Sequence, residues 1–172
     1  MAKEIGIESL NENVFSLVGK EWMVVAAGTI DNFNMMTASW GGLGWLWNRP
    51  VAFVFIRPER HTFGFTEESG SMTLSFVGND EKMRNLYNLL GTKSGRDINK
   101  MHIEGLTPIP THNNSVMFEE SRLTLVCKKL FVTDMEECNF LEKSILERWY
   151  QGHGGLHRIY VVEIEKAYAS TF

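Results

Sequence analysis

The sequence predicts a mainly β protein with a few helices, folded as one domain over residues 1–172. Several runs are rich in β-branched and aromatic residues and are bounded by turn residues, which is typical of strands. Only two stretches have a helical pattern, and they do not alternate regularly with the strands, which disfavours a doubly wound parallel sheet. The length fits a single domain with one sizeable core.

The first predicted strand covers residues 22–30 (WMVVAAGTI), and a turn is expected at Asp31, Asn32 and Asn34, because Asx side chains bond their own backbone. A strand-like run follows at 35–40. Residues 41–50 (GGLGWLWNRP) are predicted to form a loop whose two tryptophans are covered by a partner or lie over a pocket. Further strands are predicted at 51–56, 72–77, 122–133 and 157–168. Closing these strands into a barrel would remove exposed edges.

Two helices are predicted. Residues 81–90 can begin from a cap at Asn79 or Asp80 and end with Gly91 in the left-handed position. Residues 139–151 are amphipathic, and we expect their apolar stripe to pack on the core. The stripe consists of Leu141, Ile145, Leu146 and Trp149.

Composition excludes several classes of protein. The formal net charge of −4 argues against a nucleic-acid-binding protein, which needs a basic face to neutralise phosphates. Cys127 and Cys138 form no CxxC motif, and a reducing, cytoplasmic location is the simpler expectation. The N-terminus lacks the apolar segment of a signal peptide, and no apolar run is long enough for a membrane span. His153 and His157 are four residues apart, but two glycines between them disfavour a helical metal site.

The segment from residue 34 to residue 62 has the chemistry of a ligand site. The run Thr-Ala-Ser at 37–39 is small and has hydroxyls and backbone amides, so a flat ring could approach the main chain and form hydrogen bonds at its edge. Arg57, Arg60 and Thr62 follow a predicted buried strand, and two guanidinium groups with a hydroxyl suit a phosphate dianion. Without the neighbouring ring site, ordinary surface ion pairs would explain these arginines. Together, the two parts match a mononucleotide whose ring and phosphate are joined by a linear chain.

The motifs N-M-M-T-A-S-W at 34–40 and R-P-E-R-H-T at 57–62 resemble the two signature segments of the flavin reductase-like, FMN-binding split β-barrel family, which includes flavoredoxin-like proteins. The stretches G-R-D-x-x-K at 95–100 and F-E-E-S-x-L-x-L-V-C-K-K at 118–129 also resemble this family. The resemblance implies a split β-barrel that forms a homodimer with FMN near the subunit interface. The cofactor-binding residues that it implies are Asn34, Thr37, Ala38, Ser39, Trp40, Arg57, Arg60, His61, Thr62 and Lys100, with His61 standing where the family often has tyrosine.

In function, the resemblance implies an NAD(P)H-dependent flavin reductase, with NADH or NADPH as the electron donor. The flavin would perform the chemistry, so no catalytic side chain and no metal are predicted. Two alternatives stay open: a flavoredoxin-like electron carrier that serves a protein partner, and a non-catalytic flavin binder. A redox protein or a monooxygenase could accept the electrons. The sequence assigns no role to His153 or His157.

Overall fold

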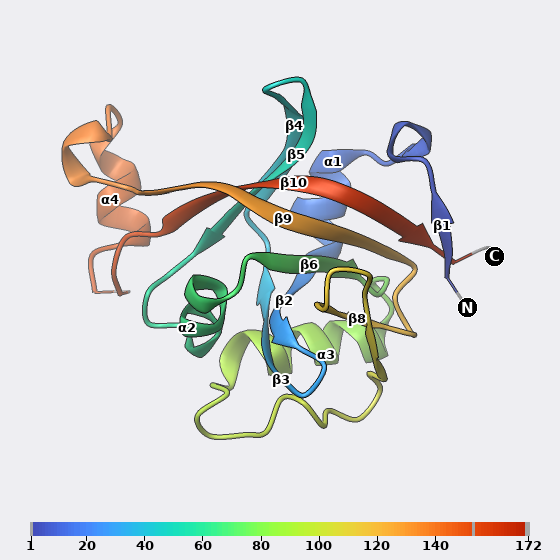
Figure 1. The fold of residues 1–172 in the computed structure, drawn as a ribbon. Helices are drawn as coiled ribbons and strands as arrows, with labels where there is room; N and C mark the ends of the chain where they lie inside the picture. The colour runs from blue at the N-terminus through green and yellow to red at the C-terminus, as the bar shows by residue number, and fades with distance from the viewer. Residues whose placement is uncertain (1, 153, 171–172) are drawn as a thin grey trace.

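The computed structural model describes residues 2–152 and 154–170 (Figure 1). Its main feature is an eight-stranded antiparallel sheet with the order β3-β2-β6-β9-β10-β5-β4, to which β1 adds by pairing with β10. A separate two-stranded sheet joins β7 to β8. The strands are β1 Lys3–Ile5, β2 Met23–Thr29, β3 Asn32–Ala38, β4 Gly41–Leu46, β5 Arg49–Ile56, β6 Ser71–Phe76, β7 Pro108–Pro110, β8 Val116–Phe118, β9 Leu123–Asp134 and β10 Arg158–Ala169.

Short helices connect and cover the strands. The α-helices are α1 Val14–Ser16, α2 His61–Glu68, α3 Glu81–Thr92 and α4 Lys143–Trp149, and the remaining helical turns are η1 Ile7–Ser9, η2 Leu17–Glu21 and η3 Glu137–Asn139. In the described part of the chain, no helix is long and apolar enough to cross a membrane. Most of the regular structure is strand, so the prediction of a mainly β protein with a few helices is confirmed.

One face of the curved sheet encloses the main core. Side chains from β2, β3, β5, β6, β9 and β10 meet there in one cluster, as the inner faces of a barrel do. Alternate residues of β2, such as Val24 and Ala26, point to the opposite face and pack with Leu86, Tyr87 and Leu90 of α3 in a second cluster. Because β2 is buried on both faces, its sequence is a continuous apolar run.

Residues 41–50, predicted as a loop, instead form a β-hairpin: β4 pairs with β5 from Gly41↔Val54 to Leu46↔Arg49. The turn residues Trp47 and Asn48 have φ values of 52° and 56°, as type I′ hairpin turns require. The loop prediction was wrong because glycines here make room for a neighbouring ring. A Cβ on Gly44 would lie 3.1 Å from the Phe53 ring.

The helix predictions were correct in part. Asp80 caps α3, where its Oδ1 accepts from Met83 N at 2.8 Å, but Gly91 lies inside the helix rather than in a left-handed cap. The helix at 139–151 is reduced to α4, which buries no residue and lies apart from the sheet (Figure 1). Core packing of its apolar stripe is therefore wrong, because Leu141 is 98% exposed. The sequence also gave no indication of α2, whose apolar pattern is weak.

Candidate functional site

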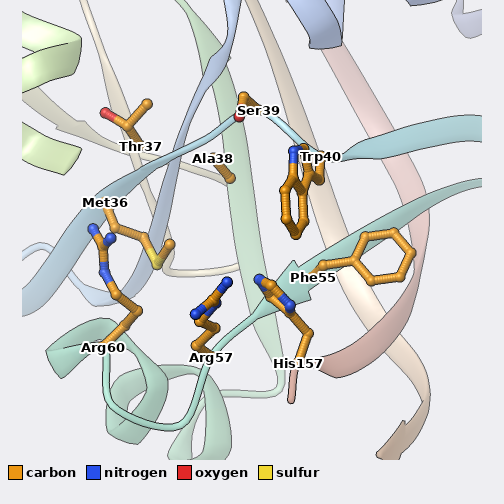
Figure 2. Close-up of a pocket in the computed structure, with 9 residues that line it drawn as sticks. All are labelled: Met36, Thr37, Ala38, Ser39, Trp40, Phe55, Arg57, Arg60 and His157. Atoms are coloured by element: carbon orange, nitrogen blue, oxygen red, sulfur yellow. The ribbon is translucent and has the colours of Figure 1, made fainter. Parts of the chain in front are cut away.

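A cavity of about 190 Å³ opens where β3 and β5 end (Figure 2). The sequence-predicted segments at 37–40 and at Arg57 and Arg60 both line it, although about twenty residues separate them in the chain. The complete lining is Met36, Thr37, Ala38, Ser39, Trp40, Phe55, Arg57, Arg60 and His157. The two parts of the predicted site therefore face one common space.

On the β3 side of the cavity, Thr37 offers its main chain rather than its hydroxyl group. β3 ends the sheet order, and Met35 O accepts from Lys100 Nζ at 3.0 Å, so the Met35 carbonyl points to the unpaired edge. In an antiparallel strand this direction alternates, which places the N–H and C=O of Thr37 on the same edge. The Thr37 side chain points away from Arg57 and His157 (Figure 2), and its Oγ1 donates to Tyr87 O at 2.6 Å.

Two guanidinium groups face this cavity from the segment after β5. Arg57 Nη2 donates to Trp149 O at 2.9 Å, and its Cζ lies 5.1 Å from the centre of the Tyr150 ring. Arg60 Nη2 donates to Leu90 O at 3.2 Å. Burial, followed by the positive charge of Arg57, lowers the pKa of Arg60. A bound anion between them would relieve this repulsion.

A second, more polar cavity of about 150 Å³ adjoins the first, and Arg60 lines both. Its lining is Glu59, Arg60, His61, Thr62, Gly91, Thr92, Lys93, Ser94, Gly95 and Lys100. Helix α2 begins here at His61, so the N-terminal end of its dipole adds positive potential.

Lys100 lies buried beneath this polar cavity. Its Nζ donates to Leu90 O at 2.8 Å as well as to Met35 O. Burial and, to a smaller extent, the charge of Arg60 lower the pKa of Lys100 to about 8. A buried ammonium group with two carbonyl acceptors keeps one N–H for a further acceptor.

Thr62 lines the polar cavity, and its contact with Asn34 joins α2 to β3. Thr62 Oγ1 donates to Asn34 Oδ1 at 2.9 Å, and both side chains are buried. Gly95 packs directly on Asn34 and His61: an added Cβ would lie 2.6 Å from His61 Cδ2 and closer still to the Asn34 amide. Asn34 lies inside β3 rather than in the predicted turn, which Ile30 and Asp31 form.

Sequence reasoning missed the wall formed by the segment after α4. His157 is 8% exposed and lines the first cavity, where its ring lies 5.1 Å from that of Trp40. Trp149 also packs edge-on against Trp40 at 5.3 Å. Burial, then the charge of Arg57, lowers the pKa of His157 to about 4. Residue spacing alone gave no signal for this contact, and His153 lies outside the described residues.

Solved structures share this fold at low sequence identity. An FMN-binding protein from Thermus thermophilus with bound p-hydroxybenzaldehyde has a TM-score of 0.67 and 19% identity, with 99% of this chain and 82% of that chain covered. Flavoredoxin from Methanosarcina acetivorans has a TM-score of 0.66 and 20% identity, with 96% and 76% covered. The NADH:FAD oxidoreductase SgcE6 of Streptomyces globisporus C-1027, in complex with NAD and FAD fragments, has a TM-score of 0.61 and 13% identity, with 87% and 74% covered.

Sequence comparison assigns the family more directly than these structures do. No curated protein matches the sequence significantly. The family model described as "Flavin reductase like domain" matches residues 15–171, which is nearly the whole chain. The chain therefore belongs to the flavin reductase-like family.

Proposed function

We propose that this protein binds FMN, with the ring in the cavity at the end of β3 and the phosphate in the adjoining polar cavity. The observation that carries the proposal is that Arg60 lines both cavities. A ring site and a phosphate site that share a lining residue suit one mononucleotide better than two separate ligands.

The charges of the polar cavity fit a phosphate dianion. Arg60, Lys93 and Lys100 contribute positive charge, and the α2 N-terminus contributes N–H donors. Glu59 is the acidic residue in the lining, and its carboxylate accepts from Gly155 N. The Glu59 carboxylate is thus engaged in a hydrogen bond with the backbone at Gly155.

The first cavity fits the flat, partly polar ring of a flavin. Ala38 is small, and the Thr37 main chain lies at a free strand edge, so the hydrogen-bonding edge of a ring can approach the backbone. Phe55 and Trp40 supply apolar surface, while Arg57 places a positive charge beside the ring. Such a charge stabilises negative charge on a reduced ring.

The chemistry that we propose is flavin reduction by NADH or NADPH, for which bound flavin supplies hydride and electron transfer. The chain's own residues bind and orient the ring, and Trp40 packs against Trp149 and His157 at one end of the cavity. Similarity to the Streptomyces globisporus NADH:FAD oxidoreductase supports a nicotinamide donor. A redox protein or a monooxygenase component is the proposed acceptor.

Similarity to flavoredoxin supports a second candidate function, an FMN electron carrier. The test begins with the visible spectrum of purified protein after addition of FMN and desalting. NADH or NADPH is then added without oxygen, with excess free FMN. Multiple-turnover bleaching identifies the reductase, whereas reduction only by a protein donor identifies the carrier. Failure to bind FMN in titration would contradict both functions.

We also propose that the protein is a homodimer. Trp45 and Trp47 are 64% and 55% exposed on the β4–β5 hairpin, and Trp47 packs against the exposed Phe131 at 6.2 Å. Exposed aromatic clusters of this kind are enriched at protein interfaces. A second copy would bury them and lie beside the hairpin strand that leads to Arg57.

A further inference from the structure

Tyr150 and His157 form a hydrogen bond at the edge of the ring cavity. Tyr150 follows α4 directly, and His157 directly precedes β10. The Tyr150 hydroxyl lies 2.9 Å from His157 Nδ1. The family assignment and the proposed flavin site give Tyr150 no role, because it does not line the cavity.

The charge state of the ring and the strength of the acceptors near the hydroxyl favour one direction for this hydrogen bond. His157 is neutral near pH 7, because burial and the charge of Arg57 outweigh the opposing charge of Glu59. A neutral imidazole has one donor and one acceptor nitrogen. The Tyr150 hydroxyl has one proton and two acceptors within reach, His157 Nδ1 at 2.9 Å and the thioether Met135 Sδ at 3.5 Å. The imidazole nitrogen is the nearer and stronger acceptor, which favours donation by the hydroxyl to Nδ1. The ring proton then resides on Nε2.

Other contacts hold Tyr150 in place. The Arg57 guanidinium lies over its ring at 5.1 Å, and Phe140 packs edge-on at 5.8 Å. His157 is fixed in turn by its backbone, since its carbonyl accepts from Met135 N at 3.0 Å. Both partners of the hydrogen bond are therefore anchored independently of it, which lets the bond select a tautomer.

We propose that Tyr150 is a positioning residue that fixes His157 as the Nε2–H tautomer, so that a neutral donor shares the ring cavity with Arg57. This inference deepens the proposed function and rests on it, because the proposed function identifies the ligand of the cavity as FMN. A neutral donor can bind a ring carbonyl or nitrogen without adding a second cation to the cavity. An imidazolium would instead repel Arg57 and a positively charged nicotinamide.

The test is NMR of the full chain labelled with ¹³C and ¹⁵N at histidine, recorded from pH 4.5 to 8. His157→Gln assigns the signal, Tyr150→Phe removes the hydroxyl, and Tyr168→Phe serves as a matched control at the far end of β10. In the wild-type protein we expect the Nε2–H tautomer throughout, with no titration near pH 6.5. In Tyr150→Phe the neutral ring loses its hydrogen bond, so we expect a tautomer mixture and a pKa raised by up to about one unit.

A wild-type ring protonated at Nδ1, or identical tautomers and pKa values in wild type and Tyr150→Phe, would overturn the proposal. Near-ultraviolet circular dichroism checks that each variant is folded. The spectra are recorded in flavin-free protein, so they do not depend on FMN binding. A separate FMN titration of the same samples tests the proposed function, and the two failures are thereby distinguishable.

Discussion

Replacing Arg60 tests the placement of the FMN phosphate most directly. Arg60 is the residue shared by the ring cavity and the polar cavity, whereas Arg57 lines the ring cavity alone. A hydrogen bond to a charged group contributes about 1.5–3 kcal/mol, and about 1.4 kcal/mol is tenfold in Kd. Arg60→Ala should therefore weaken FMN binding roughly 10- to 150-fold. The fold should survive, because Lys100 still donates to the Leu90 carbonyl.

Comparison with riboflavin, which lacks the phosphate, makes the test specific. Fluorescence titration should show that Arg60→Ala weakens FMN far more than riboflavin, while Arg57→Ala weakens both to a similar degree. Arg84→Ala on α3 is a matched control, since Arg84 packs on Trp22 away from both cavities. Equal losses of FMN and riboflavin affinity in Arg60→Ala would refute the phosphate assignment.

Three further predictions concern the pH dependence, the packing and the assembly of the protein. The pKa of Lys100 is lowered to about 8, so its positive charge is lost as the pH rises above that value. FMN binding should therefore weaken by up to about tenfold between pH 7 and 9.5. Titrations of Lys100→Met with FMN should show weaker binding without this pH dependence. Gly95→Ala should lower the free energy of unfolding by about 1–3 kcal/mol in urea and weaken FMN binding, whereas Gly64→Ala, with open space around its Cβ, should stabilise α2 by about 0.5–1 kcal/mol. Sedimentation should show a dimer for the wild type and a monomer for the double variant Trp45→Ser, Trp47→Asn; a wild-type monomer would contradict the dimer proposal.

The sequence predicted most strands correctly because their signals are local. Residues 22–30, 51–56 and 122–133 correspond to β2, β5 and β9, whose β-branched runs reflect burial in the sheet. The loop prediction for residues 41–50 was wrong, because glycine occurs in two different structural settings. Glycine marks loops, but it also makes room for a ring on the adjacent strand, and only the register with Phe53 distinguishes these uses.

The candidate site shows the same division. Local sequence identified the small residues of β3 and the two arginines, since their chemistry is visible without a structure. It left both the hydroxyl and the backbone of Thr37 as candidate groups, and the fold directs the hydroxyl to α3 and leaves the main chain at the free edge. His157 and Tyr150 were missed because their partners, Trp40 and Arg57, lie about a hundred residues away.

The sequence by itself determined which residues could recognise a ring and a phosphate, and which segments could form strands, because side-chain chemistry and hydrophobic periodicity are properties of the chain. Only the tertiary structure decided that these residues share adjoining cavities, that Lys100 is a buried cation, and that His157 is held neutral beside Arg57. The physical reason is that burial and electrostatic interactions depend on distances between residues remote in sequence, which sheet pairing sets.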